Sequence, residues 1–519
     1  MLLKAKHLPI LFILSLLFIA LCLNLGLVPY QLEEPRRVMI AFEMMKANNL
    51  IVPLELGEYY YKKPPVYNWI LMAFHSVFGE SEFVSRMANN FIYLSWAFAL
   101  FYIIKDWLGK KTALLSAVFV FTSVELLFYF SLLAEVDIFY GFITSIGMLL
   151  FLKHRENNSL KAFLALYILN AIGVLTKGLP SFIFAGGSVI LLAVYKRSWK
   201  LLFHKHHFIG IGSFVLILTT YFGLYSLFNS PLGFIEDFWS QSKYRTVLAE
   251  ADHNFWLHLW QFPLHFILSM TPGSLFLLLL LKKPGKLKSF IAKERGLLLF
   301  FFLLHFLIYW FSPGSALRYV YMLMPFWLIP IADFTVKESQ ALQNERLKKL
   351  VIFAAALISI IFSIVIYFTE NDCEIDLLIA VAFAMGFAAG SYFLLLKKNL
   401  IWSLLACMLF LRITFNYHVL PIRAEQGHVA ENYQHAEHIL EKINNEPIYL
   451  WEKCRAATFS LATGYYIERG IDTALTFTAN PYEKGYIIAE PQHVGELPTA
   501  EVVYKFTNRH IPFVLLHNK

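Results

Sequence analysis

The sequence predicts an all-α polytopic membrane protein with a small α/β domain at its carboxyl end. Of its 519 residues, 58% are apolar and 15% are charged, against roughly 45–50% and 25% in soluble domains. Apolar runs of about 20 residues, the length that crosses a hydrocarbon core as a helix, recur along the first four fifths of the chain. Residues 422–519 differ, because they alternate short apolar runs with polar stretches.

Thirteen apolar runs are long enough to be membrane spans, and they define a predicted membrane domain over residues 1–421. The first run follows Lys4 and Lys6. It is too long for a signal peptide and lacks a small-residue cleavage site, so we expect it to be retained as a span. The expected spans are residues 8–30, 83–104, 112–130, 134–152, 162–176, 180–195, 208–228, 259–281, 296–312, 317–336, 350–369, 377–396 and 399–418.

The distribution of lysine and arginine orients these spans. Cytoplasmic loops of membrane proteins are enriched in both residues. Alternate loops, beginning with the amino terminus, hold 24 of them, whereas the opposite loops hold ten before the tail. We therefore predict a cytoplasmic amino terminus and, after thirteen crossings, a tail on the outer side. The net charge of +8 then follows from topology, and no nucleic-acid partner is expected.

The tail, residues 422–519, is predicted to be a small α/β domain outside the cytoplasm. A polar helical stretch covers residues 423–445, and strand-like runs cover 448–451, 486–489, 502–506 and 513–517. No catalytic motif is present in this segment.

No cofactor is required by any motif in the sequence. The four cysteines lack a C-x-x-C spacing, so they indicate neither a disulfide scaffold nor a zinc site. Nucleotide-binding glycine motifs and D-x-D are also absent. The histidines at 204–207 lie on the cytoplasmic side and are expected to be solvated. His253, His258 and His265 lie on the outer side, where at most an incidental contact with a divalent metal is expected.

The first outer loop, residues 31–82, departs from the charge pattern of the other outer loops. It and the residues just after it hold Arg36, Arg37, Lys46, Lys62, Lys63 and Arg86. Proline is favoured in the first turn of a helix. Pro35, and later Pro64-Pro65, therefore predict two juxtamembrane helices, over residues 33–45 and 66–77, and the first has the apolar spacing of an interfacial amphipathic helix.

The amino-terminal ends of these two helices are candidate anion sites. Unpaired N–H groups and the positive end of the helix dipole attract phosphate or carboxylate. Arg36 stands at one end and Lys63 at the other. An anion anchored in the membrane, such as a lipid phosphate, suits this placement. In the alternative, these cations only hold the helices against anionic head groups, and spacing alone does not separate the two.

Carboxylates are expected at the same depth. Glu33 and Glu34 precede the first helix, and Asp137 stands where the chain re-enters the membrane. Ionisable groups at membrane depth are functional candidates because their burial is costly. For Glu135 we expect an ion pair or an exposed loop position instead. Lys177 and Arg318, two further outer-side cations, are expected to close the same cavity.

In this arrangement the sequence resembles the GT-C type lipid-linked sugar transferases of bacteria. It is most similar to the aminoarabinose transferases that modify lipid A, and to the wider clan of protein O-mannosyltransferases. The family opens with the pattern D-E-x-R, Y-x-x-K-P-P, Y-W, F-G and R. The matching residues are Glu33-Glu34-Pro35-Arg36, Tyr61-Lys62-Lys63-Pro64-Pro65, Asn68-Trp69, Phe78-Gly79, Arg86, Val136-Asp137, Leu175-Thr176-Lys177-Gly178 and Arg318-Tyr319 with Pro325. Two departures are Glu33 in place of aspartate and the absence of lysine from residues 312–317.

The resemblance implies a glycosyltransferase of the bacterial inner membrane. Such an enzyme moves a sugar from undecaprenyl phosphate or a similar polyprenyl phosphate to a lipid A-like or other envelope acceptor, on the periplasmic side and with inversion. Glu33 is then the first candidate for the base, with Asp137 as its orienting partner or substitute. The donor phosphate is assigned to Arg36, Lys63, Arg318 and Tyr319, and further substrate contacts to Glu34, Tyr61, Lys62 and Lys177.

Two alternatives remain at this stage. One is an enzyme similar to the protein O-mannosyltransferases, which differs in its acceptor. The other is a transporter or flippase of lipid-linked substrates, which should show two matching halves with broken spans and ionisable groups near the bilayer midplane. Because the unusual charges are concentrated at one surface, the sequence favours an enzyme.

Overall fold

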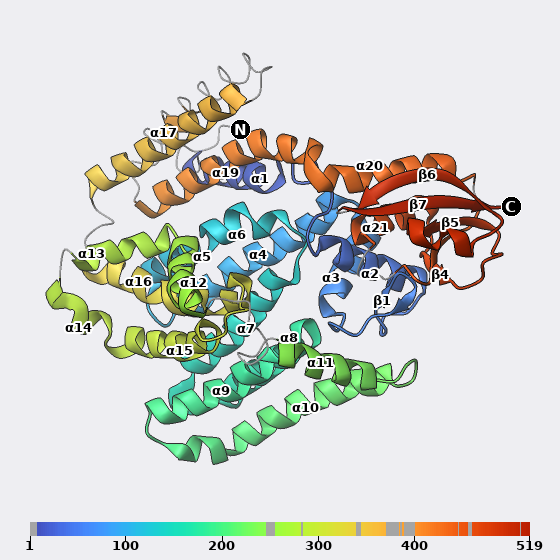
Figure 1. Cartoon of the computed structure of the whole chain (residues 1–519). Helices are drawn as coiled ribbons and strands as arrows, with labels where there is room; N and C mark the ends of the chain where they lie inside the picture. The colour runs from blue at the N-terminus through green and yellow to red at the C-terminus, as the bar shows by residue number, and fades with distance from the viewer. Residues whose placement is uncertain are drawn as a thin grey trace, which may run out of the picture.

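The computed structural model describes residues 8–244, 255–281, 284–338, 344–369, 384, 387–388, 400–444, 446–454, 459–508 and 510–519. The chain forms a helical body, and a lobe that contains a β-sheet lies at one end of it (Figure 1). This arrangement confirms the predicted fold class, a polytopic helical membrane protein with a small carboxyl-terminal α/β part.

Six helical segments of the described chain are long and apolar enough to cross a membrane, or eight if each of two bent pairs is one span. The six are α4 (Glu82–Lys105), α7 (Val136–Lys153), α8 (Leu160–Lys177), α10 (Lys205–Tyr225), η6 with α16 (Leu317–Glu338) and α19 (Leu400–Glu425). The bent pairs are α5 (Lys110–Phe121) with α6 (Val124–Phe128) and η1 (Phe130–Leu132), and α12 (Phe255–Ser269) with η4 (Gly273–Leu277) and α13 (Leu278–Leu281).

The predicted number of thirteen spans is not confirmed. Two expected spans are helices shorter than 18 residues, namely α1 (Leu8–Cys22) and α9 (Pro180–Tyr195). Others coincide with α15 (Lys293–Trp310) and α17 (Glu345–Thr369). The expected span 377–396 lies almost wholly outside the described residues. The segment Leu317–Glu338 consists of η6 (Leu317–Leu323) and α16 (Met324–Glu338). Further elements are α11 (Leu232–Tyr244), α14 (Leu287–Phe290), η2 (Arg155–Asn157), η3 (Trp199–Phe203) and η5 (Pro284–Lys286).

Both helices predicted in the first outer loop are present. The first is α2 (Glu34–Lys46), with Pro35 in its first turn, and the second is α3 (Val66–Phe78). Between them, β1 (Leu54–Glu55) and β2 (Glu58–Tyr59) form a short hairpin. The expectation that the first helix lies on the lipid surface was wrong, because residues 37–44 are all buried and α2 packs against both α3 and α21.

The carboxyl-terminal lobe is built on a five-stranded sheet with the order β4-β3-β5-β7-β6. The inner strand β3 runs parallel to β4 and β5, and β7 runs antiparallel to β5 and β6. Four of these strands were predicted; β4 and α21 were not. The elements are α20 (Gly427–Lys442), β3 (Ile448–Trp451), α21 (Leu461–Ile471), β4 (Thr476–Thr478), β5 (Gly485–Ala489), η8 (Pro491–Glu496), β6 (Ala500–Asn508) and β7 (Ile511–Asn518).

The lobe contacts the first outer loop directly. The hydroxyl of Tyr466 accepts a hydrogen bond of 2.8 Å from the backbone N–H of Tyr30, and Arg469 pairs with Glu82 at 3.3 Å. In Figure 1, α2 and β1 lie between the helical body and the lobe. The loop and the tail therefore lie on the same side of the molecule, although the boundary predicted after residue 421 falls inside α19 and stays a prediction.

Candidate functional site

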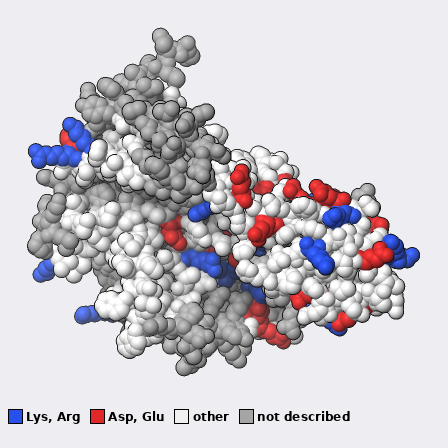
Figure 2. Space-filling model, turned by 45° about the horizontal axis from the view of Figure 1, so that its top comes forward, with Lys and Arg blue, Asp and Glu red and all other residues white. Residues whose placement is uncertain are grey.

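Charged side chains from five separate segments meet at one end of the helical body, where α7 begins and α8 ends. We call this group the charge cluster; it consists of Glu33, Arg37, Lys63, Glu135, Asp137, Lys177 and Arg318. Figure 2 shows basic and acidic side chains meeting in the crease between the helical body and the lobe, while much of the described helical surface around them is free of charge.

Asp137 and Lys177 form the best-buried ion pair of the charge cluster. Asp137 lies in the first turn of α7, where the helix dipole favours a carboxylate, and Lys177 is the last residue of α8, where it favours a cation. Lys177 donates to Asp137, and both side chains are less than a tenth exposed. Its ammonium also lies over the ring of Tyr319, 4.9 Å from the centroid, and it contacts the backbone oxygen of Arg318 at 3.4 Å.

Lys63 differs from Lys177 because it forms no ion pair with the residues that the structure describes. It lies in the turn before α3, where Pro64-Pro65 set the direction of the chain. Burial, and then the neighbouring Arg37, lower the pKa of Lys63 to about 7, although Asp137 and Glu33 oppose this shift. An incoming anion would stabilise the ammonium, so this lysine is prepared for a negatively charged ligand.

Glu33 is held by arginines. It pairs with Arg36, and Arg37 Nη2 approaches its Oε2 at 3.5 Å. Burial raises the pKa of Glu33, but Arg36, Arg37 and Lys63 outweigh burial and lower it to about 2. Arg36 also donates to Glu55 at 2.8 Å, so two carboxylates already neutralise its charge.

Arg37 is a member of the cluster that the sequence did not single out as a site residue. Its side chain is only 2% exposed. It donates a hydrogen bond of 3.0 Å to the hydroxyl of Tyr60, while its Nε is buried and has no hydrogen-bond partner among the described residues. Its position one residue after Arg36 in the resemblance motif was the available signal.

Glu34, expected to bind substrate, is instead part of a buried structural ion pair. It is fully buried, and its two oxygens accept hydrogen bonds of 2.9 Å from Arg86. It also accepts from the backbone N–H of Ala134 at 2.7 Å. Because Arg86 donates further to backbone oxygens of residues 25, 28 and 29, this pair fixes the first loop to α4 and offers no surface to a ligand.

Glu135 contradicts the expectation of an ion pair or an exposed position. It precedes α7 in extended conformation (φ −117°, ψ 151°) and is 3% exposed. It forms no hydrogen bond or ion pair with any residue that is described, and its Oε1 is buried without a partner. Burial raises the pKa of Glu135 to about 8; Asp137 adds to the rise, and Arg318 and Lys63 oppose it. The spacing Glu-Val-Asp before a span was the only sequence signal.

The remaining predicted residues lie around the cluster. Arg318 lies beside Tyr319, with its guanidinium carbon 5.7 Å from the ring centroid. Tyr61 points toward α11, where its hydroxyl accepts a hydrogen bond of 2.8 Å from Asn229 and its ring packs against Phe234. Lys62 is exposed. The structure thus brings Lys63, Lys177, Arg318 and Tyr319 together and leaves Tyr61 and Lys62 at the periphery.

No three His, Cys, Asp or Glu side chains are arranged to hold a metal ion in the described part of the chain. His253 lies outside that part, and His258 contacts the backbone oxygen of Tyr309 at 3.3 Å. The expectation that no cofactor is required stays a prediction.

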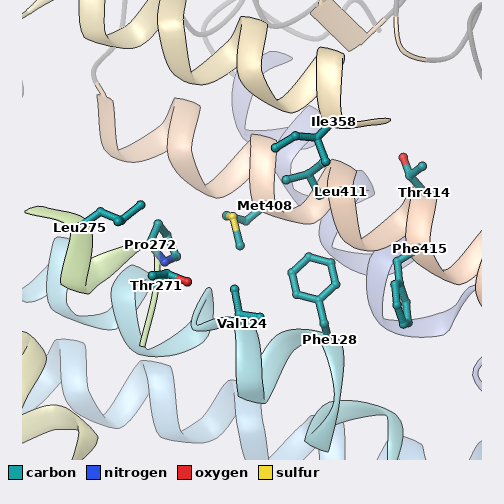
Figure 3. Close-up of a pocket in the computed structure, with 10 residues that line it drawn as sticks. All are labelled: Val124, Phe128, Thr271, Pro272, Leu275, Ile358, Met408, Leu411, Thr414 and Phe415. Carbon is teal, nitrogen blue, oxygen red and sulfur yellow. The ribbon is translucent and has the colours of Figure 1, made fainter. Parts of the chain in front are cut away.

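An apolar pocket of about 370 Å³ lies between helices of the body. Its walls come from α6, the turn before η4, α17 and α19 (Figure 3). Val124 in this wall precedes Glu125, whose carboxylate accepts a hydrogen bond of 2.9 Å from Tyr321. Tyr321 belongs to η6, as Arg318 does, so this hydrogen bond links the helix α6, which lines the pocket, to the element that carries Arg318. The lining side chains are Val124, Phe128, Thr271, Pro272, Leu275, Ile358, Met408, Leu411, Thr414 and Phe415.

The chain is similar in sequence and in fold to known membrane proteins. Residues 62–223 match the family model for dolichyl-phosphate-mannose-protein mannosyltransferases. The crystal structure of ArnT from Cupriavidus metallidurans bound to undecaprenyl phosphate superposes with a TM-score of 0.72 over 99% of both chains, at 15% sequence identity. The same protein in its apo state superposes with a TM-score of 0.70.

The sequence matches to curated relatives cover a smaller part of each chain than the superposition on ArnT does. An uncharacterised protein of Aquifex aeolicus (strain VF5) is 26% identical over 59% of this chain and 68% of its own. The undecaprenyl phosphate-alpha-4-amino-4-deoxy-L-arabinose arabinosyl transferase 1 of Sodalis glossinidius (strain morsitans) is 24% identical over 57% of this chain. This chain spans 53% of the Sodalis transferase.

The fold and the apolar helices define a class, the multi-pass membrane proteins with the fold of ArnT. Within that class the chain is similar to the aminoarabinose transferases, which confirms the resemblance predicted from its opening motif.

Proposed function

We propose that this protein is a glycosyltransferase that moves a sugar from a polyprenyl-phosphate donor to a lipid A-like molecule or another envelope acceptor. The observation that carries the proposal is the charge cluster itself. Lys63 is partly buried and has no ion pair within the described chain. It lies near Asp137 and Lys177 in a fold shared with ArnT, which was solved with undecaprenyl phosphate.

The chemistry of the donor explains the cations. A polyprenyl-phosphate sugar is a phosphodiester with one negative charge, and cleavage of its anomeric C–O bond releases a phosphate monoester with a second. Cations that face this oxygen stabilise the transition state more than the ground state, which accelerates the reaction. Lys63 and Arg318 are the best placed, because neither has a carboxylate ion pair within the described chain. Arg36 ranks behind them, since Glu33 and Glu55 hold it.

Asp137 and Glu33 are then positioning residues in our proposal. Asp137 fixes the ammonium of Lys177, and Glu33 fixes Arg36 and Arg37. A carboxylate paired with a cation has a low affinity for protons, so neither is well suited to remove the proton of an acceptor hydroxyl. The ion pairs of Glu33 therefore argue against the sequence-based assignment of this residue as the base.

The apolar pocket supports a lipid-linked donor. Its lining is almost wholly apolar, so it suits a hydrocarbon chain better than a nucleotide or a free sugar. The helix α6, which lines it, is hydrogen-bonded through Glu125 to Tyr321 of η6, the element that carries Arg318.

We further propose that transfer takes place on the periplasmic side, with inversion at the anomeric carbon. The first outer loop and the tail lie on one side of the molecule. The count of lysine and arginine assigns that side to the outside. A protein acceptor, as in the protein O-mannosyltransferases, is the second candidate, and the family model over residues 62–223 favours it.

A pair of adjacent lysines provides the test. The purified protein would be supplied with a synthetic polyprenyl-phosphate sugar and envelope lipids, and transfer would be followed by mass spectrometry. We expect Lys63→Ala to lower the rate by about 10²- to 10³-fold, as loss of one charge-stabilising donor does elsewhere. Lys62→Ala, which removes an exposed lysine from the next position, should stay within about threefold of the unaltered protein. Equal activity of the two variants would refute the assignment of the phosphate to Lys63.

A further inference from the structure

Four carboxylates lie in or beside the charge cluster, and three of them are already bound by cations. Glu33 is held by arginines, Glu34 by Arg86 and Asp137 by Lys177. A hydroxyl that attacks a sugar carbon must lose its proton, and a carboxylate without a cationic partner accepts a proton most readily.

Glu135 is the carboxylate that has no such partner among the described residues. It is 3% exposed and its Oε1 lacks any hydrogen-bond partner. A buried polar group left unsatisfied costs free energy, so such a group in a native structure calls for an explanation, of which a bound water, a ligand and a catalytic role are examples. A second group of this kind lies close by: the buried hydroxyl of Tyr67 is also unpartnered and interacts electrostatically with Glu135.

From this geometry we propose that Glu135 is the proton acceptor of the transfer reaction, acting on the hydroxyl of the acceptor. The inference rests on the proposed function, and it assigns the base to a residue other than the two that the family resemblance implies. It also favours an acceptor that attacks through a hydroxyl rather than through an oxygen that is already ionised.

The surroundings of Glu135 place it at the reacting centre. Asp137 follows it on α7, Arg318 faces it from η6 and Lys63 from the turn before α3. Glu34 of α2 also interacts electrostatically with Glu135, as do Tyr67 of α3 and Tyr129, which lies between α6 and η1. The two cations are the ones assigned to the leaving phosphate, so a sugar held between that phosphate and Glu135 would present its anomeric carbon to the acceptor.

The step balances without another reactant. The acceptor O–H bond breaks and its proton moves to a carboxylate oxygen of Glu135, while the acceptor oxygen forms a bond to the anomeric carbon. The bond from that carbon to the phosphate oxygen breaks, and its electron pair leaves with the polyprenyl phosphate. Glu135 ends as a neutral carboxylic acid and returns the proton to water after the product departs.

The ionisation of Glu135 predicts in which direction the turnover number should change with pH. Burial and Asp137 raise the pKa of this carboxyl to about 8, against Arg318 and Lys63. Below that pH the carboxyl carries a proton and cannot accept another. The turnover number at saturating donor should therefore rise with pH, by about tenfold between pH 7 and pH 9, because the ionised fraction grows from about a tenth to about nine tenths.

The experiment compares Glu135→Gln and Glu135→Asp with Glu58→Gln, which alters an exposed carboxylate elsewhere on the surface. Glu58 lies in β2 of the first outer loop, away from the segment that carries Glu135. With a polyprenyl-phosphate sugar as donor, Glu135→Gln should lower the turnover number by about 10²- to 10⁴-fold and remove its rise with pH. Binding of polyprenyl phosphate to that variant should stay within about threefold. Glu135→Asp should keep part of the activity and a rise with pH, and Glu58→Gln should match the unaltered protein.

The outcomes separate this inference from the proposed function. If the unaltered protein transfers no sugar from the donor, the proposed function fails. If it does transfer, an unchanged turnover number or an unchanged pH rise in Glu135→Gln overturns the inference, as does loss of the pH rise in Glu33→Gln alone. If Glu135→Gln does not fold, as judged by thermal unfolding, Glu135→Asp decides the matter: a pH profile identical to that of the unaltered protein would overturn the inference.

Discussion

The pKa of Lys63 makes the affinity for the donor depend on pH in a way that can be calculated. In the free protein burial and Arg37 lower the pKa of this ammonium to about 7, so above pH 7 most molecules carry a neutral lysine. A bound phosphate stabilises the charged form, and binding must then take up a proton. With one such group, the dissociation constant should rise about sixteenfold between pH 7 and pH 8.5.

Isothermal titration calorimetry in detergent can test this value with a synthetic polyprenyl phosphodiester, whose own charge does not change in that range. Titrations in buffers of different ionisation enthalpy should show an uptake of about half a proton at pH 7 and about one at pH 8.5. Lys63→Arg, which stays charged, should abolish both the uptake and the pH dependence. A dissociation constant that is independent of pH in the unaltered protein would show that Lys63 does not face the phosphate.

Two further predictions concern stability. Glu34→Gln leaves the buried Arg86 without its carboxylate and should lower the free energy of unfolding by about 3–5 kcal/mol, measured by thermal or denaturant unfolding in detergent; a loss below about 1 kcal/mol would contradict the structural role of the pair. Gly485 has φ 116°, and an added Cβ would overlap the carbonyl oxygen of Pro447. Gly485→Ala should therefore destabilise the sheet by more than about 1 kcal/mol and speed its proteolysis, whereas Gly495→Ala, with open space around it, should not.

Local signals in the sequence predicted local structure well. Pro35 and Pro64-Pro65 located the starts of α2 and α3, because proline is favoured in the first turn of a helix. Hydropathy identified the helical body, but it gave no means to see that α2 is covered by α21. Strand β4 was missed because its three residues show too little alternation to stand out.

Part of the candidate site could also be predicted from local signals in the sequence. Departure from the charge pattern of outer loops identified Lys63, Lys177 and Arg318, because that pattern depends only on topology. Which of these charges are paired depends on contacts between distant segments. Glu34 reaches Arg86, 52 residues away, and Glu135 is buried by surrounding elements, so neither the pairing of the first nor the isolation of the second could be read from neighbouring residues.

The position of α2 between α3 and α21 has a consequence for genetics. None of the residues in the charge cluster comes from the last hundred positions, yet the segment that carries Glu33 and Arg37 is clamped on its far side by that end of the chain. A frameshift late in the coding sequence would leave every residue of the charge cluster intact. It would still remove α21, which packs against the helix that carries Arg37. Screens that read such alleles as harmless truncations would misjudge them.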